Sequence, residues 1–332
     1  MSEIRFLTSS DEHLSDQTPG FRKDDYRGAI LAKLRWQGTM ATEFGASAVL
    51  RGGDFFHVKR ADRTSMATMI EAMAIHGAYP CPTYSIVGNH DMVYNDPTTL
   101  SRQPLGVMFE SKLFKRLNEE VFESGSMSVR VVGVDYTPSM TAENLAETVK
   151  SKGHSYTVAV VHALAELAPS QRTQSFFNEE ILDYRDLVFP GCPNVYVFGH
   201  YHKDQAVQEH LGVHFVNLGA ISRGALTVEN LERKPKVALM KFTSSGLSIE
   251  EAVVPHEDAQ SVFDLERKQS IEAGKQSMST FLEKLRSNAT MIGGDSIRQR
   301  MAGFMASEEF TLDEKNVVRE VFEAAEAGQG EL

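Results

Sequence analysis

Histidines paired with acids or with each other recur at short spacings along this 332-residue chain. Asp11 and His13 are two positions apart, and so are His200 and His202. Side chains at i and i+2 of an extended chain point to the same side, so each pair is expected to converge on one point. Carboxylates and imidazoles that converge in this way can bind a metal ion.

Three further motifs supply similar side chains, and each follows an apolar run. They contain Asp54 and His57 (GGDFFH), Asn89, His90 and Asp91 (GNHD), and His162 (VVHA). Taken singly, a histidine of this kind is usually a hydrogen-bonded structural residue, and GNHD has the composition of a turn. Six of the eleven histidines nevertheless fall at such positions, so coincidence is a poor explanation of the whole set.

The chemistry of these ligands indicates hydrolysis of phosphate esters. Nitrogen and oxygen donors without thiolates are typical of sites that bind Mn²⁺, Zn²⁺ or iron, rather than of a structural zinc site made of cysteines. The candidates outnumber the ligands of one catalytic ion, which predicts two divalent cations bridged by a carboxylate. Paired ions about 3.5–4 Å apart typically hold a hydroxide as the nucleophile and neutralise the phosphoryl oxygens.

The motifs need strands that deliver them to one place. Short runs rich in Val, Ile, Tyr and Phe precede them and predict strands, while residues 22–44 and 63–76 have helical periodicity. Strands and helices alternate at first, and strands follow one another directly after about residue 190. This order predicts an α/β domain in which two sheets pack together with helices outside. In open α/β sheets, ligands bind at the carboxyl ends of the strands, where the motifs lie.

Composition narrows the class of protein. No run approaches 18 apolar residues, and the first residues lack the pattern of a secretory signal. The two cysteines, Cys81 and Cys192, exclude a disulfide framework and indicate a cytoplasmic protein. The net charge of −11 argues against sequence-independent nucleic-acid binding. A local basic rim or bound cations could still reverse the sign at a site.

The ordered motifs resemble those of the calcineurin-like metallophosphoesterase superfamily over about residues 4–225. The resemblance implies a four-layer αββα fold with two metal positions. It assigns one metal to Asp11, His13, Asp54 and His202, and the other to Asp54 as the bridge, Asn89, His162 and His200. It also implies that His90 lies beside the scissile phosphate, where it would orient the phosphate or protonate the leaving oxygen.

Within the superfamily, GDFFH and GNHD are similar to motifs of the nuclease subunit of SbcCD-type double-strand-break repair complexes, in a compact form like that of phage-type subunits. Ser/Thr phosphatases of the superfamily carry an arginine soon after the aspartate, and typically GNHE. In the nuclease branch, His57 would contact the phosphate or position DNA; the alternative is that it orients a metal ligand. Basic residues beside the motifs form either a rim along the DNA backbone or a solvated surface. They are Arg22, Lys23, Lys59, Arg60, Lys203 and Arg223.

The chain is expected to contain a metallophosphoesterase domain at 1–255 and a helical region at 256–332. Thr311 and Glu314 form a capping box before the last expected helix. Nuclease subunits of this type carry a DNA-capping domain and then helices that bind an ATPase, so the capping domain must be reduced or missing here. The resemblance implies docking of the tail on an SMC-like ABC-type coiled-coil ATPase, and a homodimer. The simpler alternative is a tail packed on its own domain.

Three functions remain as hypotheses. The first is a Mn²⁺-dependent DNA exo- and endonuclease that acts in repair, recombination or replication through attack of metal-bound hydroxide, with Mg²⁺, Zn²⁺ or iron as alternative cofactors. The second is a small-molecule phosphodiesterase, for example of cyclic nucleotides, which needs no partner and suits the acidic charge. The third is a non-catalytic scaffold, which predicts eroded ligand positions, whereas every expected position is filled.

Overall fold

The computed structural model describes residues 2–57, 63–171, 179–271 and 315. One compact unit runs from Met1 to Leu265, and a second from Glu266 to Leu332. The domain boundary expected at residue 255 stays a prediction. Most of the predicted C-terminal helical region, including its capping box, lies outside the described residues.

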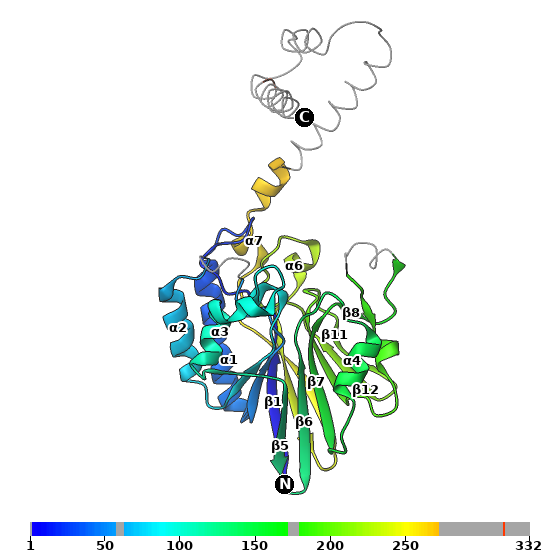
Figure 1. The fold of residues 1–332 in the computed structure, drawn as a ribbon. Helices are drawn as coiled ribbons and strands as arrows, with labels where there is room; N and C mark the ends of the chain where they lie inside the picture. Colours follow the sequence, from blue (N-terminus) through cyan, green and yellow to red (C-terminus); the bar gives the residue numbers. More distant parts are fainter. Residues whose placement is uncertain (1, 58–62, 172–178, 272–314, 316–332) are drawn as a thin grey trace, which may run out of the picture. The chain divides into compact units, whose positions relative to one another are not determined.

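Two six-stranded sheets form the centre of the first unit (Figure 1). The first has the order β14-β13-β1-β2-β3-β4, and the second has the order β11-β12-β10-β7-β6-β5. The strands of the first sheet are β1 (Glu3–Ser9), β2 (Ala48–Arg51), β3 (Thr83–Ser85), β4 (Phe114–Arg116), β13 (Lys236–Thr243) and β14 (Gly246–Val253). Those of the second are β5 (Glu119–Ser124), β6 (Met127–Val134), β7 (Tyr156–Ala163), β10 (Val195–His200), β11 (Ala206–His210) and β12 (Val213–Asn217). A separate pair consists of β8 (Ala165–Glu166) and β9 (Leu182–Asp183).

Parallel pairing brings the carboxyl ends of the central strands to the same edge of each sheet. In the first sheet, β1, β2, β3 and β4 pair in parallel, and the antiparallel strands β13 and β14 continue beyond β1. In the second sheet, β6, β7, β10 and β12 are parallel, with antiparallel β5 and β11 at the edges. Residues that follow these parallel strands are therefore neighbours in space.

Apolar side chains fill the space between the two sheets. Phe6 and Leu50 of the first sheet and Val160 of the second are fully buried members of this core. Leu7 belongs instead to a cluster that includes Ala41, on the other face of β1. This alternation is the period of two that a strand buried on both faces requires.

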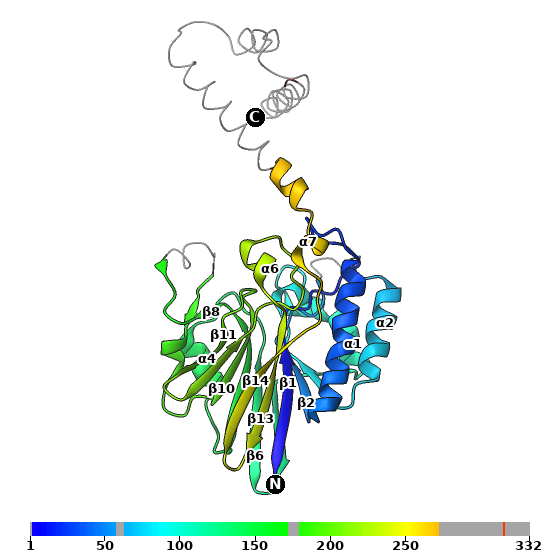
Figure 2. The same cartoon turned by 180° about the vertical axis from the view of Figure 1, so that it is seen from behind.

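Helices cover the outer face of each sheet. The helices α1 (Tyr26–Phe44), α2 (Met66–Gly77) and α3 (Pro104–Glu110) pack at the first sheet, and α4 (Ala142–Val149) with the 3₁₀-helix η4 (Tyr184–Leu187) at the second. Figure 2 shows α1 and α2 on one side of the strands and α4 on the other. The four-layer αββα architecture predicted from the sequence is confirmed.

Capping residues set the starts of the first two helices later than the periodicity predicts. Asp25 accepts a hydrogen bond from the backbone N–H of Gly28, and Ser65 accepts one from that of Thr68. Such caps satisfy N–H groups that have no partner within the helix. The helices expected at 22–44 and 63–76 therefore begin at Tyr26 and Met66. Shorter helices are η2 (Asn89–Asp91), η3 (Pro97–Arg102), α6 (Val228–Glu232) and α7 (Ala259–Val262).

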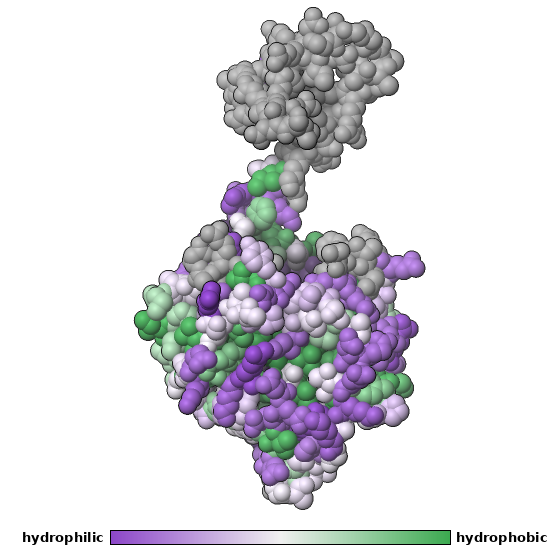
Figure 3. Space-filling model, in the orientation of Figure 1, coloured by the Kyte–Doolittle hydropathy of each residue, from purple (hydrophilic) through white to green (hydrophobic). Residues whose placement is uncertain are grey.

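The surface of the first unit that is visible in Figure 3 contains both hydrophilic and hydrophobic residues. On the face shown in Figure 3, hydrophilic residues cover much of the surface and hydrophobic residues form small groups between them. Within the part of the chain that the structure describes, none of the helices combines the length and apolar composition that crossing a membrane requires.

Candidate metal centre

The five motifs meet at the carboxyl ends of the parallel strands of both sheets. The loops after β1, β2 and β3 supply the members from the first sheet, and β7 and β10 with the loop that follows supply those from the second. Gathered in this way are Asp11, His13, Asp54, Asn89, His162, His200 and His202. All seven predicted metal ligands are therefore close together.

Two glycines allow the strand ends of the two sheets to approach so closely. A Cβ atom on Gly199 would lie 2.2 Å from the carbonyl oxygen of Gly52. A Cβ atom on Gly53 would lie 2.5 Å from Nδ1 of His162, and the φ of Gly53 is 89°, which side chains rarely adopt. Gly53 of GGDFFH and Gly199 of FGHYH thus allow the candidate ligands to lie close together, because neither position has room for a side chain.

The first group of donors consists of Asp11, His13, Asp54 and His202, whose ligand atoms lie within 4.8 Å of one another. Nε2 of His13 is 3.0 Å from Nε2 of His202 and 3.8 Å from Oδ2 of Asp54. Nε2 of His202 is 3.4 Å from Oδ1 of Asp11. The side chain of His202 is 45% exposed, whereas both carboxylates are fully buried. This group is therefore open to solvent on the side of His202.

The second group consists of Asp54, His162 and His200, so Asp54 belongs to both. Nε2 of His162 is 3.5 Å from Oδ2 of Asp54 and 3.1 Å from Oδ1 of Asn89. Nδ1 of His162 contacts the carbonyl oxygen of Gly52 at 2.6 Å. If Nδ1 carries the hydrogen of this bond, Nε2 keeps its lone pair and can bind a metal ion.

The surroundings of the Asp54 carboxylate indicate whether the donors fit metal ions. Its Oδ1 accepts a hydrogen bond of 2.8 Å from the backbone N–H of His90. Its Oδ2 is buried and has no hydrogen-bond partner among the described residues. A buried polar atom without a hydrogen bond costs about 1–3 kcal/mol, and the cost is larger for a charged group. A bound cation would remove this cost, and two donor groups that share Asp54 therefore fit two metal ions.

Four of the ligand residues have a strained backbone. The φ angles of Asp11, His13, Asp54 and His200 are 56°, 48°, 54° and 86°, in the left-handed region. Such conformations cost about 1–3 kcal/mol each for residues other than glycine, and they gather at functional sites. The expectation of an extended chain from Asp11 to His13 is therefore wrong. The loop turns sharply there, and its hydrogen bonds to Gly53 and Asp54 hold the turn.

Burial and neighbouring charges set the protonation of the residues in the centre. Burial raises the pKa of Asp11, but His202 and His162 outweigh this effect and lower it to about 2. Burial is likewise outweighed at Asp54, where His162 and His13 hold the pKa well below its usual range. Burial, with His202 nearby, holds the pKa of His13 well below its usual value, so His13 is neutral. Burial also lowers the pKa of His162, but the Asp54 and Asp11 carboxylates raise it overall to about 9.

His90 and His57 lie beside the first donor group. Their rings stack with centroids 4.8 Å apart, and the ring of His90 also packs edge-on against His13. Nδ1 of His57 is 3.2 Å from Nδ1 of His13. This contact favours the interpretation in which His57 orients a metal ligand, while its place in the adjoining pocket keeps it within reach of a substrate.

Asp91, the last residue of GNHD, fixes the loops. Its carboxylate accepts hydrogen bonds from the backbone N–H groups of Asp54, Phe56 and Gly88, at 2.9, 3.2 and 3.0 Å. Burial and the Asp54 charge raise its pKa well above the usual value. Asp91 thus joins the loop after β2 to the loop after β3.

The predicted basic rim is only partly exposed. Arg22 and Arg223 are buried, and their guanidinium groups donate to Asp24 and to backbone carbonyl groups. Their burial argues against the predicted role in DNA binding, because neither can reach a phosphate at the surface. Lys23 and Lys203 are exposed. Lys59 and Arg60 lie outside the described residues.

Two residues of the centre were missed in the sequence. Oε2 of Glu179 is 3.1 Å from Nε2 of His200, and Oε1 of Glu179 accepts a hydrogen bond of 2.9 Å from the hydroxyl group of Tyr136. Tyr136 lies just after β6, so the strand-end rule that identified the other motifs could have found it. No local signal marks Glu179, because the chain brings it to His200 from a loop.

A pocket of about 420 Å³ adjoins the first donor group. His13, His57, His90 and His202 are among the residues that line it. Its volume is within the range of about 300–1,000 Å³ that is typical of small-molecule sites.

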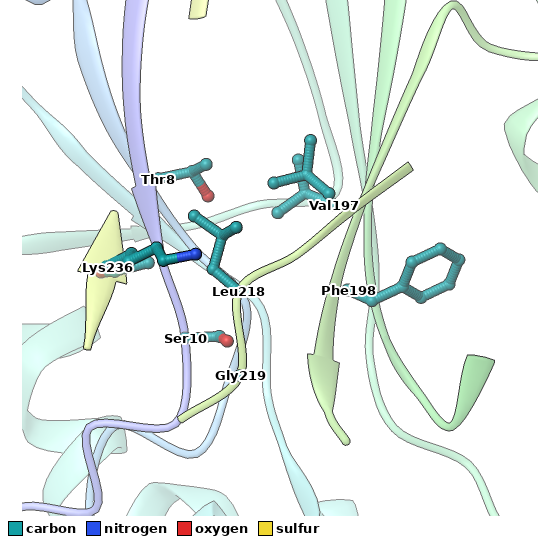
Figure 4. Close-up of a pocket in the computed structure, with 9 residues that line it drawn as sticks. Thr8, Ser10, Val197, Phe198, Leu218, Gly219 and Lys236 are labelled. Carbon is teal, nitrogen blue, oxygen red and sulfur yellow. The ribbon is translucent and has the colours of Figure 1, made fainter. Parts of the chain in front are cut away.

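A second cavity between the two sheets has a volume of only about 10 Å³. Thr8 of β1 and Val197 of β10 lie on opposite sides of it (Figure 4). This volume is about that of a single water-sized sphere, so the cavity cannot hold a substrate.

No protein-family model and no curated protein sequence matches this chain. Solved structures that resemble it include an archaeal phosphodiesterase, at 14% identity and a TM-score of 0.38 over 76% of this chain and 100% of that one. A protein of Thermus thermophilus has 13% identity and a TM-score of 0.43, over 74% and 98% of the two chains. A dimetal phosphatase from Danio rerio has 13% identity and a TM-score of 0.49, over 77% and 100%. At identities this low, the function must be argued from the residues of this chain.

Proposed function

We propose that the chain is a two-metal phosphodiesterase and that its substrate is DNA. The observation that carries the proposal is the pair of donor groups that share the Asp54 carboxylate. Paired divalent ions need such an arrangement, and they typically serve the hydrolysis of phosphate esters. The choice of DNA, in repair, recombination or replication, is supported by the resemblance of GDFFH and GNHD to motifs of the SbcCD-type nuclease subunit.

The donors suit two divalent cations, with Mn²⁺ favoured and Mg²⁺, Zn²⁺ or iron as alternatives. Asp11, His13, Asp54 and His202 would hold one ion, and Asp54, Asn89, His162 and His200 the other. When bound, the ions would neutralise phosphoryl oxygens and activate water for attack. The two aspartates offset two of the four positive charges, which leaves roughly +2 to attract an anionic diester.

His90 is proposed to act on the leaving group. Its ring lines the pocket, and its backbone N–H group holds Asp54. A protonated imidazole at this place can donate a proton to the leaving oxygen, a contribution of typically 10²–10⁴-fold in rate. His57 keeps His13 and His90 in position through its contacts with both, and contact with the phosphate is its second proposed role.

Cleavage of end-labelled linear DNA tests the proposal. Purified protein would be incubated with duplex and single-stranded DNA in Mn²⁺, Mg²⁺ or EDTA, beside the Asp54→Asn variant. Degradation that needs Mn²⁺ and is abolished by the variant is expected. Intact DNA of both kinds, with and without an ABC-type ATPase partner, would refute DNA as the substrate.

A small-molecule phosphodiesterase is the second candidate. The pocket beside the histidines and the net charge of −11 favour it. Turnover of cyclic nucleotides by a protein that leaves DNA intact would select it. A failure to bind any divalent metal, measured by calorimetry, would favour a non-catalytic scaffold.

The proposed partner is an SMC-like ABC-type ATPase, docked through residues 256–332, with a homodimer of the chain in the cytoplasm. The support for the partner and the dimer is the resemblance of the motifs, and the support for the cytoplasm is the low cysteine content. Co-purification of the full-length chain with such an ATPase, followed by light scattering of the complex, tests both associations.

A further inference from the structure

The pocket beside the metal centre supports an inference about the substrate that rests on the proposed function. We propose that the pocket binds the base of one unstacked nucleotide, while the adjoining phosphodiester lies at the metal centre. The substrate would then be a diester with an unpaired nucleoside, supplied either by the end of a DNA strand or by a small nucleotide.

Most of the other residues that line the pocket come from two loops. The loop before α1 contributes Pro19, Gly20 and Phe21, and the loop after β12 contributes Gly224 and Ala225. Aromatic and apolar side chains beside small residues leave room for a flat ring to enter and stack. Stacking on aromatic side chains is a general means of binding bases without sequence preference.

The electrostatics of the pocket also favour an uncharged group. Among the lining residues that the structure describes, there is no lysine, arginine, aspartate or glutamate. The arginines nearest in sequence, Arg22 and Arg223, are buried, and each donates to backbone carbonyl groups. The attraction for the phosphate would therefore arise at the metal centre, and the walls would bind the organic part of the substrate.

Hydrogen bonds from buried side chains fix the two loops in place. Arg22 Nη1 donates to the carbonyl oxygen atoms of Ser222 and Arg223, at 2.9 and 3.0 Å, and so joins one loop to the other. Lys33 Nζ donates to the carbonyl oxygen of Ile221 at 2.7 Å. The hydroxyl group of Tyr26, which lines the pocket, donates to the carbonyl oxygen of His13 at 2.8 Å. The walls are thus attached to the metal centre and formed before substrate binds.

The size of the pocket selects an unpaired nucleotide. A volume of about 420 Å³ suits one small organic group and excludes a base pair within a helix. Enzymes that place a base of duplex DNA in a pocket must first remove it from the stack, at a cost of a few kcal/mol. Single-stranded ends and small nucleotides avoid this cost, so they are the expected sources of the bound unit.

Gly224 offers a way to fill the pocket without straining the backbone. A Cβ atom on Gly224 would lie 3.6 Å from Cγ of Pro19, and 3.9 Å from both Oγ of Ser222 and the hydroxyl oxygen of Tyr26. These are ordinary contacts with pocket residues, so alanine fits and leucine extends among them. Gly246 is an exposed glycine of a β-turn with open space around it, and Gly246→Leu is the matched control.

Two diesters with the same leaving group separate this inference from the proposed function. They are thymidine 5′-(4-nitrophenyl) phosphate and methyl 4-nitrophenyl phosphate, which differ in the nucleoside. Wild type and the Gly246→Leu control are expected to prefer the nucleoside diester in kcat/KM by about 5- to 150-fold, the range that stacking of one base provides. Gly224→Leu should remove most of this preference, Phe21→Ala part of it, and Gly224→Ala the least.

Calorimetry with thymidine 5′-monophosphate and inorganic phosphate supplies a readout that needs no turnover. The nucleotide should bind more tightly than phosphate to wild type in Mn²⁺, and Gly224→Leu should reduce this difference. Thermal melts identify a variant that fails to fold, in which case Phe21→Ala carries the test.

Short oligonucleotides distinguish the two sources of the nucleotide. Faster hydrolysis of a single strand than of a blunt duplex identifies a DNA end, whereas turnover of cyclic or dinucleotide substrates alone identifies a small nucleotide. Equal kcat/KM of wild type for the two diesters would overturn the inference. The same follows if Gly224→Leu and Phe21→Ala each lower kcat/KM by the same factor for both diesters. If neither diester is hydrolysed, the proposed function fails, and the calorimetric comparison alone decides whether the pocket binds a base.

Discussion

The two sheets hold their candidate metal ligands in different ways. Asp11, His13 and Asp54 of the first sheet lie in loops beyond β1 and β2, each with a left-handed backbone. His162 of the second sheet lies within β7, where it pairs with Gly199 of β10, and His200 ends β10 with a positive φ of its own. A hydrogen-bonded ladder therefore holds most of the second set, whereas the first set needs support from other side chains.

Buried polar side chains provide that support. Glu12, between Asp11 and His13, points the other way and forms a fully buried ion pair with Arg51, next to the GGD turn. Ser9 and Gln37 also contact the Arg51 guanidinium group. The difference between the sheets teaches that precise placement of loop ligands depends on residues behind them, which bind neither metal nor substrate.

Removing the bridge should have the largest effect, because Asp54 belongs to both donor groups. Asp54→Asn keeps the shape of the side chain but loses the charge that would hold the two proposed cations. We expect phosphodiester hydrolysis to fall by several orders of magnitude in a folded protein. Steady-state rates with a 4-nitrophenyl diester in Mn²⁺ measure this loss, and activity within tenfold of wild type would show that Asp54 is no bridge.

His90→Ala should lower kcat by about 10²–10⁴-fold, because it would remove the proposed general acid and leaves both donor groups that share Asp54 intact. The number of metal ions bound per chain should stay as in wild type. A diester with a leaving group of low pKa needs less protonation and should lose less activity. An equal loss for good and poor leaving groups would contradict the role of His90 as an acid.

Breaking the buried support of the first sheet should reduce stability. Arg51→Met removes the ionic partner of the buried Glu12 carboxyl group, and loss of one partner of a buried ion pair costs about 3–5 kcal/mol. Arg116 forms an exposed ion pair with Asp135, so Arg116→Met is the control, with an expected cost of about 0–1 kcal/mol. Urea unfolding measures the change in the free energy of unfolding for both variants. Equal changes would contradict the claim that the buried ion pair supports the first sheet more than a surface ion pair does.

Substitution of His57 decides between its two roles. If it orients His13, His57→Ala should weaken Mn²⁺ binding by about 10- to 100-fold, as is typical for residues that hold a metal ligand. If it contacts the phosphate, kcat/KM should fall while Mn²⁺ affinity stays constant. Calorimetric titration alongside steady-state kinetics separates these outcomes. If Mn²⁺ affinity and kcat/KM both stay as in wild type, both roles of His57 are excluded.

The smallest expected effect concerns pH and the histidines of the two groups. The pKa of His162 is raised to about 9, so metal binding must release its proton at lower pH, whereas His13 is already neutral. Metal affinity of the second group should therefore rise with pH up to about 9, by about tenfold per unit for one proton released. Calorimetry in two buffers of different ionisation enthalpy counts the protons, and zero release at pH 7 would contradict this assignment.

Much of the fold and of the candidate centre could be predicted from strand ends. Apolar runs and their closing motifs indicated the two packed sheets, and they identified the residues from Asp11 to His202 that gather at one edge. The reason is general, because parallel strands in both sheets end at that edge. The roles of the gathered residues remain predictions.

Features that depend on tertiary contacts could not be predicted. Three such features depend on contacts between segments that are distant in sequence. They are the left-handed turns at Asp11 and His13, the burial of Arg22 and Arg223, and the contact of Glu179 with His200. A basic residue beside a motif looks the same in sequence whether it faces solvent or holds a loop. Only packing decides between these two outcomes.

The number of Mn²⁺ ions bound by each wild-type chain tests the central claim most directly. Metal-free protein would be titrated with Mn²⁺ by calorimetry, and the bound ions counted by elemental analysis after gel filtration. Two donor groups that share Asp54 predict two ions per chain. One ion or none per chain would contradict the account of a two-metal phosphodiesterase.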